Sequence, residues 1–383
     1  MFETVSADYG RNSLVRKIWI NCGELSGDIQ GAELVKALKE NRADLEFVGM
    51  GGENLKNQGV RTLFHINELS VMGISEVIEA LPRILGLLKR IKQALLQEKP
   101  DALLVIDAPD FNFRVIGMAK KLGIPVYYFI PPKVWAWRKY RLRFLKDNVK
   151  KIYSILPFEV EFYRENNVEI QYIGNPLVQV VNADAYRHIE PVSARIALMP
   201  GSRKREISAL LPVFSEMAEN MARNNPDFAF YLIQAPQFSE EFLRSFWKSS
   251  VPLHFIPAEK RHAFLASCEM AVAASGTAVL ETALLGVPTM VAYKVKPFSY
   301  MLGKFFVHVK YVSLPNLILG KELFPELLQN DANALNLAEI AKTWHYHKSV
   351  REEIRKGCLL IREKLGDTKS AELFAQDFIK ELL

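Results

Sequence analysis

The chain has 383 residues, of which 49% are hydrophobic and 24% charged, and this balance excludes a disordered, collagen-like or disulfide-scaffold protein. At about 150 residues per domain, the length predicts two or three domains. The net charge of +6 is too small for a protein that binds nucleic acid over its whole surface, and the excess of basic residues is concentrated in one segment. Residues 133–151 carry eight basic side chains and one acid, which leaves the rest of the chain at −1.

The cysteines and the first residues indicate a cytoplasmic protein without a membrane span. Cys22, Cys268 and Cys358 are odd in number and far apart, which favours a reducing compartment over a disulfide framework. The N-terminal residues include acids and no apolar core, so we expect no secretory signal. No run of about 18 uncharged apolar residues occurs, so we expect surface contact with a membrane at most.

The first half of the chain alternates short apolar runs with helical patterns. After an extension (residues 1–17) that matches no pattern, residues 18–180 read as one domain with strands over 18–21, 46–52, 102–107, 126–129, 151–156 and 170–174. Strands joined by helices need crossover connections, and crossovers of this length produce parallel sheets covered on both faces. The pattern therefore predicts an α/β domain with a parallel sheet.

The second half repeats the same pattern after a polar segment, residues 179–193, which we interpret as the linker. Residues 194–340 are predicted to form a second domain, with a strand and turn over 195–203 and strands over 228–233, 253–256, 270–275 and 288–293. Residues 341–383 are predicted to be helices, with breaks near Gly357 and Gly366. Two doubly wound domains side by side bind ligands beyond the carboxyl ends of their strands.

The loop SGTAVLE, which begins at Ser275, follows a predicted strand and opens a helix. Small residues at Gly276 and Thr277 let a ligand approach the free N–H groups, where the helix dipole favours a phosphate. One turn into the helix, the Glu281 carboxylate is suited to accept two sugar hydroxyls of a nucleotide. A tightly packed turn with a surface glutamate is the alternative interpretation.

The loop PGSR follows another predicted strand and places Ser202 and Arg203 between this strand and the start of the next helix. The arginine offers a forked, permanent cation that suits a diphosphate leaving group. Lys204 and Arg205 extend the basic cluster. A helix-entry turn with solvated charges is equally compatible with this sequence.

The loop GELSGD follows the first predicted strand and is similar to phosphate- or sugar-binding first loops through Gly23, Ser26 and Gly27. It lacks the G-x-G-x-x-G spacing, so a dinucleotide fingerprint is absent. Ser26 or Asp28 as a plain helix cap is the alternative.

The loop DAPDFN places two carboxylates at the end of the third predicted strand. Asp107 sits in a loop stiffened by Pro109, and a carboxylate fixed there is a reasonable general base for a substrate hydroxyl, or else a loop-capping acid. Asp110 is expected to cap the next helix. The sequence has neither an HExxH nor a D-x-D pattern, and His345 and His347 fall on different helix faces, so we expect no metal and no cofactor.

Two stretches indicate an interaction surface. Residues 69–96 repeat apolar side chains at helical spacing among basic ones, which fits a helix on a bilayer surface or a core-facing helix. Residues 133–151 mix their cations with four aromatic residues, Trp135, Trp137, Tyr140 and Phe144. That mixture suits an anionic headgroup layer, RNA or a solvated helix face.

Nine motifs together resemble the lipid-A-disaccharide synthases, bacterial glycosyltransferases, and they occur in that family's order between residues 18 and 331. They are GELSGD, VMGISEV, IDAPDFN, VWAWR, LPFE, PGSR, SGTAVLE, YKVKPFS and YVSLPNLILG. The resemblance implies two facing Rossmann-like domains of the GT-B type. It implies inverting transfer of 2,3-diacylglucosamine from UDP-2,3-diacylglucosamine to 2,3-diacylglucosamine 1-phosphate, which yields the β-1′,6 disaccharide and UDP.

By matching position, Asp107 would be the catalytic carboxylate and Arg203 would neutralise the departing diphosphate. Gly276, Thr277 and Glu281 would hold the nucleotide, with Asn316 nearby. The resemblance also implies a cytoplasmic enzyme associated peripherally with the inner face of the inner membrane, without nucleic acid; a homodimer stays open. Three places depart from the family's pattern: Leu25 stands where a small residue is usual, Pro132–Lys133 where serine is favoured, and Asn175 where histidine is common, so this side chain cannot titrate.

Several alternatives stay open at this point. The nucleotide loops alone also fit the glycosyltransferase that makes lipid II or a UDP-sugar 2-epimerase, although IDAPDFN and VWAWR argue against both. An RNA-binding protein would use the basic stretch at residues 133–151, yet no known RNA module occurs. A catalytically inactive membrane-surface scaffold is the third alternative.

Overall fold

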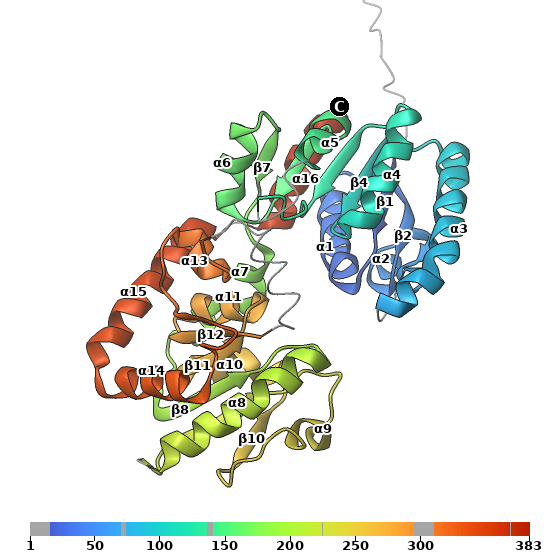
Figure 1. Cartoon of the computed structure of the whole chain (residues 1–383). Helices are drawn as coiled ribbons and strands as arrows, with labels where there is room; N and C mark the ends of the chain where they lie inside the picture. The colour runs from blue at the N-terminus through green and yellow to red at the C-terminus, as the bar shows by residue number, and fades with distance from the viewer. Residues whose placement is uncertain (1–15, 70–73, 136–140, 224, 295–309, 368) are drawn as a thin grey trace, which may run out of the picture.

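The protein consists of two α/β lobes, each built on a parallel sheet (Figure 1). The computed structural model describes residues 16–69, 74–135, 141–223, 225–294, 310–367 and 369–383, with the backbone alone described for 74–80. The predicted α/β fold with two parallel sheets is confirmed. The motifs VMGISEV, VWAWR and YKVKPFS lie partly outside the described residues, and Trp137 and Tyr140 lie wholly outside them.

The first sheet has the strand order β3-β2-β1-β4-β5-β6-β7, with every neighbouring pair parallel. Its strands are β1 (Arg16–Cys22), β2 (Leu45–Gly51), β3 (Arg61–His65), β4 (Ala102–Ile106), β5 (Val126–Phe129), β6 (Lys151–Ser154) and β7 (Ile170–Tyr172). The connecting elements are α1 (Leu25–Asn41), α2 (Glu53–Asn57), η1 (Ile66–Glu68), α3 (Ile74–Glu98), α4 (Pro109–Lys121), α5 (Arg141–Asn148) and α6 (Pro157–Glu165). Helix α1 covers one face of the sheet, while α3, α4 and α5 cover the other, so the apolar central strands are buried on both sides.

The second sheet has the order β10-β9-β8-β11-β12-β13 and follows α7 (Pro176–Val181) and η2 (Ala183–Tyr186). Its strands are β8 (Val192–Met199), β9 (Ala229–Ile233), β10 (Leu253–Ile256), β11 (Cys268–Ala274), β12 (Thr289–Tyr293) and β13 (Glu326–Leu328). Its helices are α8 (Lys204–Ala222), α9 (Glu240–Arg244), η3 (Ala258–Lys260), α10 (Arg261–Ala266), α11 (Thr277–Leu284), α13 (Leu314–Leu319), α14 (Ala334–Tyr346) and α15 (Lys348–Leu365). The sheet's inward side chains form a separate hydrophobic core.

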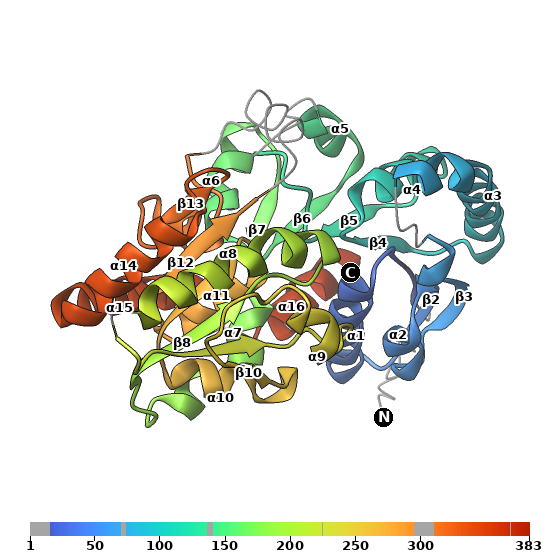
Figure 2. The ribbon, with the colours of Figure 1, turned by 60° about the horizontal axis from the view of Figure 1, so that its bottom comes forward.

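The last helix, α16 (Ser370–Leu382), returns to the first sheet and lies beside α1 (Figure 2). Its Phe374 and Phe378 are fully buried against Tyr127 and Tyr153, at ring-centroid distances of 4.7 Å. Helices α14 and α15 instead pack on the second domain. The C-terminal helices therefore divide between the two domains.

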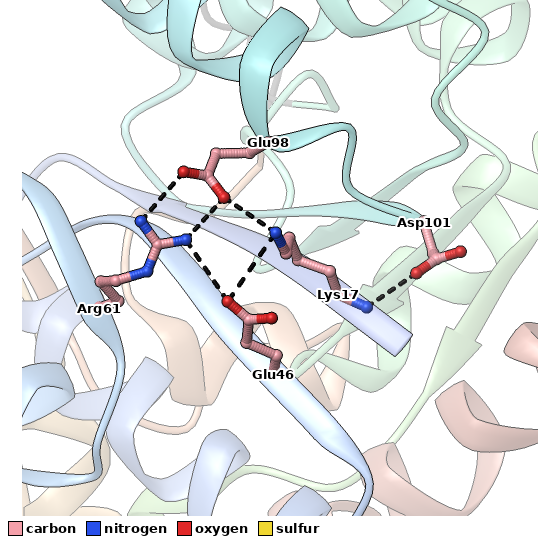
Figure 3. A network of polar contacts seen from close by, with 5 residues as sticks. All are labelled: Lys17, Glu46, Arg61, Glu98 and Asp101. Atoms are coloured by element: carbon pink, nitrogen blue, oxygen red, sulfur yellow. Dashed lines mark hydrogen bonds and ion pairs between the residues drawn. The ribbon is translucent and has the colours of Figure 1, made fainter. Parts of the chain in front are cut away.

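A charged network closes the amino-terminal edge of the first sheet (Figure 3). Glu98 at the end of α3 accepts from Arg61 of β3 at 2.6 Å and from Lys17 of β1 at 3.0 Å. Hydrogen bonds from Arg61 and then Lys17 lower the pKa of Glu98 to about 2. Parallel strands point their carboxyl ends the same way, so this network marks the edge opposite to the candidate site.

Two helix predictions have distinct outcomes. The break near Gly366 is confirmed, because α15 ends at Leu365. The break near Gly357 is wrong, because Gly357 lies inside α15. A Cβ atom at Gly357 would come within 2.2 Å of Leu323, so the glycine allows close packing there. Among the described helices, none is long and apolar enough to cross a bilayer.

Candidate active site at the carboxyl ends of the strands

Asp107 lies directly after β4, at the turn into α4. Asp107 and Ala108 adopt φ values of 49° and 42°, a left-handed conformation that is unfavourable for two successive residues with side chains. Pro109 occupies the first helical turn, where its missing N–H costs nothing. Burial raises the pKa of the Asp107 carboxyl, while the Ala108 N–H and the charge of Lys133 lower it in part. A half-buried carboxylate of raised pKa is a fitting proton acceptor.

The GELSGD loop lies against the Asp107 turn. A Cβ atom at Gly23 would come within 2.7 Å of the Ala108 Cβ atom and 2.6 Å of a Leu69 methyl group, so only glycine fits. Gly27 is buried beside Cys22, and Ser26 is exposed at the start of α1. Asp28 points elsewhere: its buried carboxylate accepts the backbone N–H groups of Gly52, Asn54 and Leu55 and so anchors α2.

Glu24 is a residue of this site that the sequence analysis missed. Burial raises the pKa of its carboxyl and the charge of Asp107 raises it further, whereas the charge of Arg203 lowers it. The GELSGD and DAPDFN loops of the first domain and the PGSR loop of the second are thus close enough to interact electrostatically. The glutamate stands inside a quoted motif, but its neighbours in space cannot be seen from one sequence.

The PGSR loop is the N-terminus of α8, with Arg203 at the cap position. The guanidinium is 81% exposed and pairs with Glu206 at 3.0 Å. The other Glu206 carboxylate oxygen accepts the backbone N–H groups of Ser202 and Arg203, at 3.1 and 3.2 Å. This loop therefore already binds a carboxylate, which is the chemistry of an anion site at a helix start.

The SGTAVLE loop leads from β11 into α11 as expected. Gly276 and Thr277 are exposed at the helix start, and a Cβ atom at Gly276 would meet nothing within 4 Å. Glu281 is buried, and its Oε2 atom contacts the Arg261 Nε atom at 2.8 Å and the His262 Nε2 atom at 3.0 Å. Burial pushes the pKa of Glu281 up, but His262 and Arg261 outweigh it and leave the pKa below its usual value.

Asn316 on α13 is fully buried and bonded at both amide atoms. Its Nδ2 atom donates to the Phe324 carbonyl and to Glu326, and its Oδ1 atom accepts the N–H groups of Leu323 and Phe324. In this structure its side chain holds the 323–326 segment together. Asn175 caps α7 by accepting the Leu177 N–H at 2.9 Å.

Several cations of the basic stretch at residues 133–151 form ion pairs within this chain. Lys151 is buried and pairs with Asp377 and Glu381 of α16, and Lys150 pairs with Glu381. Arg141 pairs with Asp110, the acid expected to cap α4. With Arg143, which pairs with Asp147 at 3.9 Å, four of the six cations that the structure describes in this stretch lie against acids of this chain. Asp110 lies in the first turn of α4, whose cap position is Ala108.

Solved structures of known proteins show the same fold. UDP-GlcNAc 2-epimerase from Neisseria meningitidis, solved with UDP-GlcNAc, matches with a TM-score of 0.64 over 95% of this chain and 100% of that one, at 14% identity. A calicheamicin glycosyltransferase matches with a TM-score of 0.59 over 96% and 98% of the two chains, also at 14% identity. At such identities the likeness concerns the fold alone.

Sequence comparisons distinguish among proteins of this fold. Lipid-A-disaccharide synthase from Myxococcus xanthus is 39% identical over 96% of this chain and 97% of its own. The enzyme of that name from Syntrophus aciditrophicus is 37% identical over 93% and 95%. The family profile described as lipid-A-disaccharide synthetase matches residues 18–378, which span both sheets and α16 as far as Phe378. The chain therefore belongs to the lipid-A-disaccharide synthase family.

Proposed function

We propose that this protein transfers 2,3-diacylglucosamine from its UDP carrier to 2,3-diacylglucosamine 1-phosphate, with inversion at the anomeric carbon. Family membership supports the disaccharide-forming reaction. The observation that carries the mechanism is the half-buried Asp107 carboxyl, held at the end of β4, while the charges of both Asp107 and Arg203 act on the pKa of Glu24. A base and a cation on loops of different domains suit a displacement that joins two substrates.

In this mechanism Asp107 accepts the proton of the acceptor's 6-hydroxyl group as its oxygen attacks the anomeric carbon. The new C–O bond forms as the bond to the UDP phosphate oxygen breaks, and the electron pair leaves with UDP. Arg203 stabilises the negative charge that develops on the diphosphate. Its exposed guanidinium needs only to turn away from Glu206 to reach an anion.

The donor's nucleotide would bind at the second domain. The exposed helix start at Gly276 and Thr277 is suited to a phosphate, and Ser202 offers a second anion contact. Glu281, oriented by Arg261 and His262, would accept sugar hydroxyls, and Asn316 would support that region through the segment it holds. The exposed Ser26 would face the acceptor from the first domain, and the buried Gly23 and Gly27 would shape the loop that presents it.

The decisive test is product analysis by mass spectrometry with the two acylated glucosamine substrates. We expect a disaccharide monophosphate together with UDP in equal amounts. Asp107→Ala should abolish turnover and leave UDP binding unchanged. Asp110→Ala, three residues along and exposed, is the matched control and should keep turnover. Full turnover in Asp107→Ala would refute the assigned base, and an epimerised UDP-sugar without disaccharide would refute the reaction.

We also propose that α3 contacts the anionic inner face of the inner membrane, where both acylated substrates reside. Leu81 and Leu85 are 45% and 51% exposed on this helix, beside exposed Arg83, Lys89 and Lys92. Apolar and basic side chains on one exposed helix suit an anionic bilayer surface. Replacing both leucines with glutamate should reduce sedimentation with anionic vesicles, whereas Leu335→Glu, an exposed leucine on α14, should not. Equal sedimentation of both variants would contradict the contact.

A further inference from the structure

A chain of buried polar side chains lies directly beneath the Asp107 turn. Asn21, Asn112, Trp19 and Tyr128 are all fully buried, in the layer between the first sheet and its α3–α5 face. Trp19 and Asn21 come from β1, Tyr128 comes from β5 on the other side of β4, and Asn112 comes from α4. Burying an amide side chain costs free energy unless its polar atoms are hydrogen-bonded, so the partners of these four side chains decide whether the arrangement is stable.

Two hydrogen bonds of this chain reach the backbone carbonyl oxygen of Asp107, and Asn112 Nδ2 also donates to the preceding carbonyl, that of Ile106, at 3.2 Å. Asn112 Nδ2 donates to the Asp107 oxygen at 2.7 Å, and Tyr128 Oη donates to it at 3.0 Å. Asn112 is itself held, because its Oδ1 atom accepts from Asn21 Nδ2 at 2.8 Å. Asn21 in turn accepts from the Trp19 indole N–H at 3.3 Å.

The bonded carbonyl belongs to the strained part of the backbone. Asp107 and Ala108 are successive residues in the left-handed region, where side chains are disfavoured. Such a conformation persists only when the surrounding structure imposes it, and it is typical of functional sites. Two donors on one carbonyl fix the peptide plane that follows Asp107, and this plane determines where the carboxyl points.

We propose that Asn112 and Tyr128 are positioning residues, which hold the Asp107 carboxyl in its productive orientation by clamping its backbone carbonyl. Neither side chain touches the substrate, since both are fully buried. The inference rests on the proposed role of Asp107 as the base. Misplacing a reacting group by about 1 Å costs on the order of a hundredfold in rate, so the clamp acts on kcat.

Tyr128→Phe removes one donor and keeps the buried ring, and Tyr127→Phe is its matched control. Tyr127 is the adjacent residue on the opposite face of β5, and its hydroxyl donates to the Glu381 carbonyl of α16 at 3.3 Å. We expect Tyr128→Phe to lower kcat about tenfold, with KM for both substrates changed less than twofold. Tyr127→Phe should keep the wild-type kcat. Asn112→Ala should lower kcat by roughly a hundredfold.

The outcomes separate this proposal from the one it rests on. If Asp107→Ala is inactive but Tyr128→Phe has the kcat of Tyr127→Phe, the positioning role of Tyr128 is wrong, and the role of Asp107 as the base is unaffected. If Asp107→Ala keeps full turnover, the base is wrong and the clamp falls with it. A rise in KM equal to the loss in kcat would also overturn the clamp, because positioning a base leaves substrate binding intact.

Discussion

Three effects of different kinds act on the pKa of the Asp107 carboxyl. Burial raises its pKa, whereas the Ala108 N–H and the Lys133 ammonium lower it. A general base must be ionised to act, so kcat should rise with pH through this raised pKa. With Asp107 as the proposed base, we therefore expect its surroundings to set the lower end of the pH range in which kcat is high.

Lys133→Ala tests this balance at the residue scale. Removing a cation that favours the ionised carboxylate raises the pKa of Asp107 further, so the acidic limb of the kcat–pH profile should move to higher pH. Lys146→Ala, an exposed lysine on α5, should leave the profile in place. The measurement is kcat at saturating substrates from about pH 4, near the ordinary carboxyl pKa, up to about pH 8. An unmoved limb would contradict the coupling.

Gly23→Ala probes the contact between the GELSGD loop and the Asp107 turn. The added methyl group must displace Ala108, so we expect a loss of about 1–3 kcal/mol in stability and a marked fall in kcat. Gly117→Ala on α4 is the control, because its Cβ atom meets nothing within 4 Å. That variant should gain about 0.5–1 kcal/mol with unchanged kcat. Denaturant titration and steady-state rates measure both.

The residues of the site were largely predictable because parallel strands bring their carboxyl ends to one edge. Asp107, Arg203 and Gly276 each follow an apolar run, and the structure places each in the loop between a strand and the next helix. The partners of Glu281 were not predictable. Arg261 and His262 lie twenty residues earlier on α10, and only the packing of α10 against α11 brings them to the carboxylate.

At the scale of elements, the central strands and the edge strands β7 and β10 were predicted, whereas the edge strands β3 and β13 were missed. Central strands are apolar on both faces, which makes a continuous run that is visible in one sequence. Strand β3 has a mixed pattern with two exposed positions, and β13 has three residues. Such short, half-exposed segments carry little signal, because their pairing depends on a neighbour rather than on their own composition.

Helix α6 contains a buried acid that couples its position to pH. Glu159 accepts from the Trp135 indole at 2.7 Å and also bonds Ser154, so it ties the 131–135 segment to the end of β6. Burial raises its pKa to about 7, despite the hydrogen bonds from Ser154 and Trp135. An acid with a raised pKa in the folded state weakens the fold as pH rises, since its charged form is disfavoured there.

Glu159→Gln should therefore become more stable relative to the wild type as pH rises from 5 to 8. The wild type loses stability between its ordinary pKa near 4.5 and about 7, by at most about 1.4 kcal/mol per pH unit, and the amide loses none. Glu161→Gln, exposed on the same helix, should show no such trend. Urea titration at several pH values measures the difference. A constant difference between the two proteins would contradict the raised pKa.

At the scale of the whole molecule, the chain crosses between the domains twice. It leaves the first sheet after β7 and returns between α15 and α16. The two crossings are tied together, because the Tyr172 hydroxyl donates to the Leu365 carbonyl at 2.7 Å and Arg362 pairs with Asp184 at 2.5 Å. Sequence patterns predicted helices over 341–383 but not which sheet each one covers, because an amphipathic helix can pack its apolar face against either sheet.

Phe374→Ala should destabilise the first domain, although residue 374 follows the second domain in the chain. The side chain is fully buried against Tyr153 and Phe129, so we expect a loss of about 3–5 kcal/mol. Calorimetry should show the transition of the first domain at lower temperature, with the second nearly unchanged. Leu383→Ala, which is 83% exposed, should shift neither transition.

The return of α16 also sets the order in which the protein can be completed during synthesis. The face of the first sheet that carries Tyr127 and Tyr153 is translated about 200 residues before the helix that covers it. At a translation rate of roughly 5–20 residues per second, this apolar face stays uncovered for about 10–40 s during synthesis. The second domain can close on itself in that interval, and the first domain reaches its final packing only when α16 arrives.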